Sequence, residues 1–184
     1  MLTSKIMSIG RIALQTEGGY ITRLFLPCEA PAASEPPVGT LAKIAFRQLQ
    51  EYLEGTRHNF DLPLAPPQGT PLQQEIMHRM CHIPYGCTVT YAELGPARTV
   101  GSVCSANPLP ILRPCHRVLP AHNPPGHYRG GTQLKALLLE LEKGLVTNYE
   151  VPVVKPGGQS PRNSKTFNIQ LSTFNIPLSP RCHK

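Results

Sequence analysis

Cys115 and His116 stand side by side in this chain, and Arg117 follows them. A cysteine attacks as the thiolate, so it needs neighbours that lower its pKa or accept its proton. His116 can accept that proton, and Glu142, at the end of a leucine-rich segment, can orient the imidazole. These residue types predict nucleophilic chemistry at Cys115. The alternative is a buried, unreactive cysteine followed by two surface residues, because consecutive side chains need not face each other.

Six cysteines occur, at positions 28, 81, 87, 104, 115 and 182, and no two of them form a CxxC pair. The adjacent pairs Cys81-His82 and Cys115-His116 do not have a spacing that places two ligands on one metal ion. We expect no metal ion, with a zinc site built from dispersed residues as the alternative. The N-terminus shows no secretory signal, so we expect an intracellular protein of the cytoplasm or nucleus, in a reducing environment.

The chain that must position these residues has 184 residues, of which 40% are hydrophobic and 16% charged. This composition predicts a folded protein with one domain and a small additional lobe. Its 21 prolines argue against a simple helical bundle. No apolar run approaches the roughly 20 residues that a membrane span needs, so no membrane association is expected.

The net charge of +7 suits a polyanionic partner such as nucleic acid. Most of the excess lies in residues 151–184, which carry five basic residues and no acidic ones, while residues 1–150 carry 13 basic and 11 acidic residues. A nucleic-acid surface on the folded part must therefore depend on local patches rather than on overall charge.

The N-terminal pattern predicts a β-hairpin over residues 10–26, with Gly18-Gly19 at its turn. A helix is expected over residues 40–56, and a short strand over residues 60–64. The expected buried face of that helix consists of Leu41, Ile44, Ala45, Leu49 and Leu53.

Four further helices are expected. They cover residues 71–81 with Thr70 as N-cap, residues 91–94 with a Thr90–Glu93 capping box, residues 97–106, and residues 132–143 with Thr132 as N-cap. The first of them should bury Leu72, Ile76, Met77 and Met80. An extended run is expected at 110–112 and a Gly/Pro-rich loop at 119–131.

The fold class is therefore α+β. The predicted organisation is an N-terminal lobe of hairpin and helix (1–68), a mainly α-helical domain (69–145) and a loosely ordered basic tail (146–184).

Several segments, taken in order, carry a resemblance to one known family. The segment 107–118, NPLPILRPCHRV, resembles the active-site segment of the O6-alkylguanine-DNA alkyltransferases, also called methylated-DNA–protein-cysteine methyltransferases. Residues 83–86 with 90–91 resemble the family's helix-turn-helix entry, and residues 97–101 resemble its recognition helix. Residues 126–131 resemble the loop after the active site, and Lys135 to Glu142 the closing helix. The likeness covers about residues 40–144.

This resemblance implies a suicide DNA-repair enzyme with a helix-turn-helix, and it implies that no cofactor is required. It implies that Cys115 accepts the alkyl group from O6 of guanine irreversibly, with His116 as its base through a water and Glu142 holding the imidazole. Asn107 would bridge two elements beside the cysteine. The implied partner is double-stranded DNA containing O6-alkylguanine, bound by a monomer.

The resemblance also assigns a DNA-binding set and a substrate pocket. Tyr91 would rotate the target phosphate, and Arg98 would enter the base stack in place of the extruded base. Gly101 and Arg117 complete the DNA-binding set. Tyr128, Pro110 and Lys135 would line the pocket for the alkylated base.

Tyr91 and Arg98 are only seven positions apart, roughly half the separation that a full helix-turn-helix needs. Arg113 also stands where the family has an apolar residue. Two alternatives therefore stay open. One is a degenerate relative that binds alkylated DNA without efficient transfer, and the other is an unrelated Cys-His hydrolase with multiple turnovers.

Overall fold

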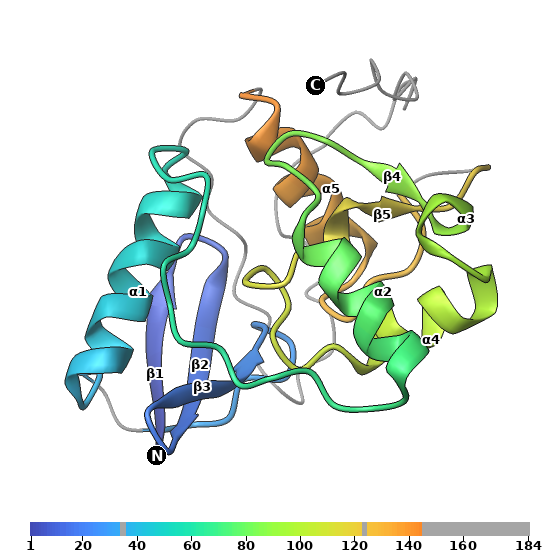
Figure 1. Cartoon of the computed structure of the whole chain (residues 1–184). Coiled ribbons are helices and arrows are strands. Elements are labelled where there is room, and N and C mark those ends of the chain that lie inside the picture. The colour runs from blue at the N-terminus through green and yellow to red at the C-terminus, as the bar shows by residue number, and fades with distance from the viewer. Residues whose placement is uncertain (34–35, 123–124, 145–184) are drawn as a thin grey trace.

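The computed structural model describes residues 1–33, 36–122 and 125–144. Figure 1 shows a mixed α+β molecule in which an N-terminal sheet and one helix lie beside a group of shorter helices. The predicted mixture of α and β elements is confirmed. The predicted basic tail lies outside the described residues.

The N-terminal sheet is antiparallel and has the order β1-β2-β3. Its strands are β1 (Leu2–Met7), β2 (Gly10–Glu17) and β3 (Tyr20–Phe25). The predicted hairpin is confirmed, with Gly18 (φ 57°) and Gly19 (φ 83°) in the positive-φ turn that suits the strand twist. The sequence analysis did not predict β1, which adds a third strand.

Helix α1 (Thr40–Leu53) packs along this sheet and ends earlier than predicted. Ala45 and Leu49 are buried as predicted. Leu41, Ile44 and Leu53 are only partly buried. The buried face consists of Ala42, Ala45, Phe46, Gln48, Leu49 and Tyr52. Gln48 can face inward because its amide donates to the Asp61 carbonyl (3.0 Å) and accepts from the Asp61 N–H (2.9 Å). These bonds hold the segment after α1 in place. The strand predicted over residues 60–64 is not formed, because only Leu64 pairs, in an isolated bridge with Ile21.

Helix α2 (Pro71–Cys81) begins where predicted. The Thr70 hydroxyl accepts from the Gln73 N–H (3.3 Å), and the Gln73 side chain accepts from the Thr70 N–H (2.9 Å). Ile76, Met77 and Met80 are buried as expected. The prediction for Leu72 was wrong, because this residue lies in the first turn with 49% of its surface exposed.

The remaining elements are short. Strand β4 (Val89–Thr90) pairs in parallel with β5 (Val118–Leu119), and helices α3 (Tyr91–Leu94) and α4 (Ala97–Ala106) follow β4. A 3₁₀ turn, η1 (Cys115–Arg117), precedes β5, and helix α5 (Thr132–Glu142) closes the described chain. The N-cap of α5 is Gly131 rather than the predicted Thr132, since Gly131 has a φ of 87° and no side chain caps the helix.

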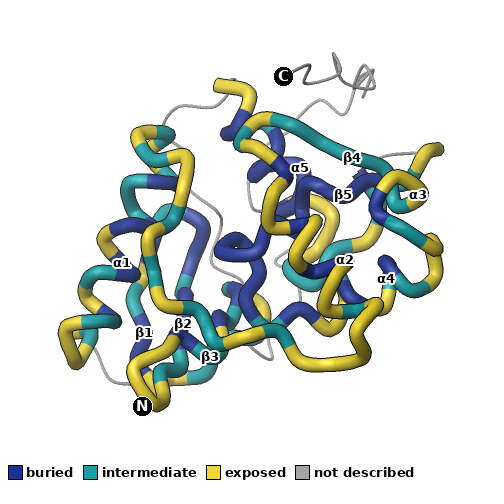
Figure 2. Tube along the Cα trace, in the orientation of Figure 1, coloured by how far each residue is buried: buried dark blue, intermediate teal, exposed yellow. Residues whose placement is uncertain are grey.

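Two hydrophobic cores form. The first joins the sheet, α1, residues 109–112 and the leucines of α5, and the second joins α2, α3 and α4 to Cys115 and Val118. The first core therefore includes residues from both sides of the predicted boundary at 68. In Figure 2 the buried trace is continuous through the centre, along α5 and the segment before β5. Helix α5 contributes leucines to the first core, and its Lys135 side chain reaches Val118 of the second. No helix in the described ranges is long and apolar enough to cross a membrane.

Candidate active site

Cys115 is the first residue of η1 and is 5% exposed, at the edge of the second core. Asn107, at the end of α4, holds it in place. The Asn107 amide donates to the Arg113 carbonyl (2.9 Å) and to Sγ of Cys115 (3.2 Å), and its oxygen accepts from the Leu109 N–H (3.1 Å). These bonds close residues 107–113 into a turn, so the prediction of an extended run at 110–112 was wrong. Ile111 has a φ of 71°, a strained conformation held by this packed turn.

His116 is fully buried, and its Nε2 lies 2.9 Å from Oε1 of Glu142. Burial alone would raise the pKa of Glu142, but the bonds from His116 and Arg117 lower it to about 2. The carboxylate is therefore ionised and can only accept, so Nε2 must carry the hydrogen. Nδ1 of the neutral ring is then unprotonated. It is buried and has no hydrogen-bond partner among the described residues, and burial lowers the pKa of His116. The ring is thus a neutral base whose accepting atom is available.

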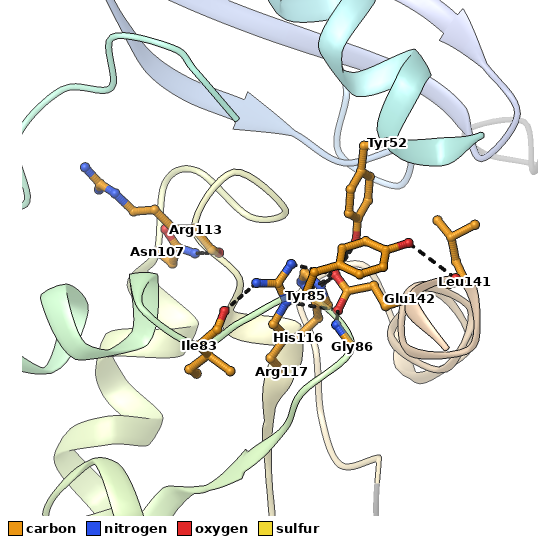
Figure 3. A network of polar contacts seen from close by, with 10 residues as sticks. All are labelled: Tyr52, Ile83, Tyr85, Gly86, Asn107, Arg113, His116, Arg117, Leu141 and Glu142. Atoms are coloured by element: carbon orange, nitrogen blue, oxygen red, sulfur yellow. Dashed lines mark hydrogen bonds and ion pairs between the residues drawn. The ribbon is translucent and has the colours of Figure 1, made fainter. Parts of the chain in front are cut away.

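Arg117 does not have the DNA-binding position expected for it. Its guanidinium is buried and donates to both carboxylate oxygens of Glu142, with Nε to Oε2 and Nη2 to Oε1 both at 2.9 Å. Nη1 donates to the carbonyl of Ile83 at 2.6 Å. Figure 3 shows Arg117 enclosed between these partners. It neutralises the carboxylate that holds His116, and the expectation of a DNA contact is corrected on that ground.

The charges around the thiol act in two directions. Burial raises the pKa of Cys115, while the Asn107 hydrogen bond and the cations Lys135 and Arg129 oppose that rise. Lys135 is itself buried, donates to the Val118 carbonyl (2.8 Å), and has a pKa lowered to about 8 by burial. It is therefore a buried positive charge, held by β5, that acts on the thiol. Because the resting thiol is protonated, it needs a base such as His116.

Two other side chains beside the thiol have buried polar atoms without a partner among the described residues. They are the hydroxyl of Tyr128 and Nη1 of Arg129. The ring of Tyr128 meets that of His116 edge-on (6.5 Å between centroids), and Arg129 donates to the Ser105 carbonyl through Nη2 (2.8 Å). Unpartnered buried polar atoms are costly unless a ligand or water satisfies them. Their gathering next to Cys115 favours a pocket for a polar substrate.

Tyr91, another predicted DNA-binding residue, packs against the cluster that contains Cys115. It is half-buried beside the second core, and burial and the two thiols Cys104 and Cys115 raise its pKa. Arg98 is exposed in the first turn of α4. Gly101, on the same helix, has open space where a Cβ would be. Tyr91 thus lies at the core that contains the thiol, while Arg98 is exposed.

Pro110 lies buried in the turn before Cys115, paired with Arg113. Its neighbours Leu109 and Ile111 pack into the first core. The surroundings of Pro110 thus anchor the turn to the N-terminal lobe. Across the described ranges, no group of three or more His, Cys, Asp or Glu side chains is arranged to hold a metal ion.

The geometry can now be compared with known proteins. Residues 71–144 match the family model described as 6-O-methylguanine DNA methyltransferase, DNA binding domain. The constitutive methylated-DNA–protein-cysteine methyltransferase of Bacillus subtilis is 36% identical over 151 residues, which cover 73% of this chain and 90% of that protein. The chain belongs to the 6-O-methylguanine DNA methyltransferase family.

Two further similarities agree with this family. The inducible methyltransferase of B. subtilis is 40% identical over 112 residues, but the match spans only 62% of that protein. The solved structure of Mycobacterium tuberculosis OGT in complex with DNA is 33% identical, with a TM-score of 0.69 over 79% of this chain and 94% of that one. The methyltransferase likeness therefore extends to the N-terminal lobe as well as to residues 71–144.

Sequence reasoning missed two partners of Glu142 in this methyltransferase. The backbone N–H of Gly86 donates to Oε2 at 3.1 Å, and the hydroxyl of Tyr52 donates to Oε1 at 2.7 Å. Tyr52 lies outside the 71–144 match, on α1. A signal was present for it: a large residue with a hydroxyl four positions after Gln48, on the face that proves to be buried. The predicted face counted only aliphatic residues and so did not include Tyr52.

Proposed function

We propose that this chain repairs DNA by direct reversal, taking the alkyl group of O6-alkylguanine onto Sγ of its own Cys115, once per molecule. The family to which the chain belongs supports methyl transfer from DNA to a protein cysteine. The observation that carries the assignment to Cys115 is the buried His116. Its Nε2–H is held by an ionised carboxylate and its Nδ1 is left free, one residue from a buried thiol.

The transfer needs one proton movement and one displacement. His116 takes the proton of the Cys115 thiol, through a water that joins Sγ to Nδ1. The sulfur then forms a bond to the alkyl carbon while the bond from that carbon to O6 breaks, and the electron pair stays on guanine. Guanine gains a proton overall, from Tyr91 or another N–H or O–H donor of the pocket. The step balances with no added reactant.

The product explains why each molecule acts once. A thioether offers water no leaving group that would regenerate the thiol, so Cys115 stays alkylated. Arg117, Gly86 and Tyr52 keep the Glu142 carboxylate in place and ionised, which fixes the ring of His116.

We propose that α3 and α4 form a shortened helix-turn-helix that binds duplex DNA. The two helices are joined only by Gly95 and Pro96. Arg79 of α2 supports this arrangement, because its guanidinium donates to the Leu94 carbonyl (2.7 Å) and the Glu93 carbonyl (3.0 Å) at the end of α3. With Tyr91 beside the thiol and Arg98 exposed, this surface can hold an extruded base at Cys115 while Arg98 enters the stack.

We call Cys115, His116, Glu142 and the donors to Glu142 the relay. The relay favours action by a monomer, because all of its residues come from a single chain. It does not favour the alternative of a relative that binds without transfer, since the thiol, base and carboxylate are all present. A multiple-turnover hydrolase is likewise not favoured, given the family.

The stoichiometry of labelling tests this function. The free base O6-benzylguanine should benzylate one cysteine per chain and then stop, and peptide mapping should find the label on Cys115. The control is Cys104→Ser, which should keep full labelling, because burial raises the pKa of Cys104 to about 12 and leaves that thiol protonated. Continued turnover, or a label on Cys104, would contradict the proposal.

A further inference from the structure

Tyr52 is the one relay partner supplied by the N-terminal lobe among the contacts described above. It lies in the last turn of α1 and is fully buried. Its hydroxyl is 2.7 Å from Oε1 of Glu142 and 3.3 Å from Nε2 of His116. Figure 3 shows the Tyr52 ring pointing from α1 onto the carboxylate that holds His116.

The direction of these bonds follows from the protonation states. Burial raises the pKa of Tyr52 well above its usual range, with Glu142 adding to the rise, so the hydroxyl keeps its proton. That proton goes to Oε1, because Glu142 is ionised and Nε2 already carries a hydrogen. Oε1 therefore accepts from Tyr52 and His116, and also from Nη2 of Arg117.

Donors from three residues thus share the negative charge of Oε1. Each added donor weakens the pull of the carboxylate on a second proton at His116. The imidazole stays neutral to lower pH as a result, and a neutral imidazole is the form that can accept the thiol proton.

We propose that Tyr52 is a positioning residue for the transfer, whose hydroxyl holds the Glu142 carboxylate against His116 and limits its attraction for an imidazolium proton. The N-terminal lobe then takes part in the chemistry, although neither the thiol nor its base belongs to it. The proposed consequence for the rate rests on the proposed function of Cys115.

The surrounding rings keep the hydroxyl in place. The Tyr52 ring contacts that of Phe60 (5.3 Å between centroids) and meets Tyr85 edge-on (6.0 Å). Tyr85 is itself stacked on His58 (4.0 Å), and its own hydroxyl is directed to the Leu141 carbonyl (3.4 Å) rather than to the relay. Tyr85 therefore offers a matched control, since it is a neighbouring tyrosine that has no hydrogen bond to His116 or Glu142.

Other groups around His116 also affect its titration and must be kept constant. The charged and titratable neighbours from every element that packs against the ring are Cys115 and Arg117 on η1, Lys135 and Glu142 on α5, Tyr52 on α1, and Tyr128 in the loop before α5. The test therefore removes one oxygen atom and leaves all charges unchanged.

The test is an NMR titration of the His116 ring in the wild type, Tyr52→Phe and Tyr85→Phe, with resonances assigned by a His116 variant. The midpoint should rise by about one pH unit in Tyr52→Phe, because a donor to the carboxylate is lost. It should stay at the wild-type value in Tyr85→Phe. The acid limb of the O6-benzylguanine reaction rate should move upward by the same amount in Tyr52→Phe alone.

The outcomes separate this inference from the proposed function. A wild type that does not react with O6-benzylguanine defeats the function, while the titration still decides what Tyr52 does. An unmoved midpoint in Tyr52→Phe, or an equal shift in Tyr85→Phe, overturns the inference. A rate that falls equally at every pH overturns it too, because packing damage alone has that effect.

A measurement on the wild type remains if Tyr52→Phe does not fold. The Tyr52 hydroxyl proton should exchange slowly with solvent, since it is buried and bonded to a carboxylate. A rapidly exchanging hydroxyl would contradict the proposal without any variant.

Discussion

The relay around Glu142 and the α3–α4 surface differ in how firmly they are built. In the relay, every oxygen of the carboxylate has donors from elements far apart in sequence: α1, the segment after α2, and η1. In α3–α4, a helix of four residues meets one of ten across a two-residue link. Figure 2 shows the contrast, with a buried trace at the relay and an exposed one along the outer side of α3 and α4.

This difference separates two requirements of one reaction. Proton transfer needs groups held to within a fraction of an ångström, so its residues are buried and interlocked. Binding of duplex DNA relies largely on contacts between exposed cations and phosphates. Such contacts tolerate changes in the helices that carry the cations. A change in the relay should therefore affect all substrates, and a change in α3–α4 should affect duplex substrates only.

The largest effect is expected at the thiol. Cys115→Ala should abolish transfer from both the free base and the duplex, because no other group of the site can accept the alkyl carbon. The fold should persist, since a buried side chain is shortened by one atom. Label incorporation checks the loss of transfer, and thermal unfolding of the same sample checks that the fold persists. Transfer at the wild-type rate would refute the assignment.

A smaller loss is expected when the orienting carboxylate becomes an amide. Glu142→Gln should slow both substrates on the order of 100-fold, because the imidazole loses its anchor and Arg117 its counter-charge. The apparent pKa of the Cys115 thiol should rise. Glu140→Gln, on the same helix, is the control and should react like wild type. The rate-versus-pH profile decides, and equal profiles for the two variants would count against the relay.

Acid unfolding provides a second check on Glu142. Its pKa in the folded protein, about 2, lies below the ordinary value of 4.5. The stabilisation is therefore complete above pH 4.5 and is lost as the pH falls through about 2. Glu142→Gln should be less stable than wild type at pH 7, with a difference that shrinks toward pH 2. A constant difference across that range would mean that the carboxylate is not paired as described.

A change in the α3–α4 surface is expected to reduce only the rate of reaction with duplex DNA. Arg98→Ala should slow reaction with a duplex lesion about tenfold if Arg98 fills the vacated stack as proposed. Reaction with free O6-benzylguanine should be unchanged because that substrate needs no extrusion. Lys43→Ala, exposed on α1, serves as the control. Equal slowing of both substrates by Arg98→Ala would place Arg98 in the chemistry instead.

The smallest effect is expected from the basic C-terminal residues. Truncation after residue 150 removes five positive charges and no negative ones. The duplex reaction should slow by a few-fold at low salt and by less at high salt, because screening already weakens those charges. The free-base reaction should be unaffected. If truncation changed neither rate, the tail would be a passive extension.

The sequence predicted the elements that local patterns specify. The Gly18-Gly19 turn, the Thr70 cap and the α4 boundaries depend on neighbouring residues, and all three are confirmed. On α1 the prediction was right for Ala45 and Leu49 but did not include Gln48, whose burial depends on its bonds to Asp61, a contact that no helical period contains. Tyr52 was not included either, because its role depends on a bond to Glu142, 90 positions away in the chain.

The roles of charged residues were harder to predict than their presence. Arg117 looked like a surface cation beside the nucleophile, but it is buried against Glu142, 25 positions away in the chain. Its partner comes from a tertiary contact between η1 and α5, so local sequence could not specify it. The same holds for residues assigned from the resemblance. A sequence motif identifies them, but the fold determines where each side chain lies and what it contacts.

The most direct test of the account is mass spectrometry of the chain after exposure to duplex DNA containing O6-methylguanine. We expect the mass of one methyl group to be added per molecule, on the peptide that contains Cys115, with unmodified guanine left in the DNA. A methyl group on a different cysteine, or more than one methyl group per chain, would contradict the assignment of Cys115 as the acceptor.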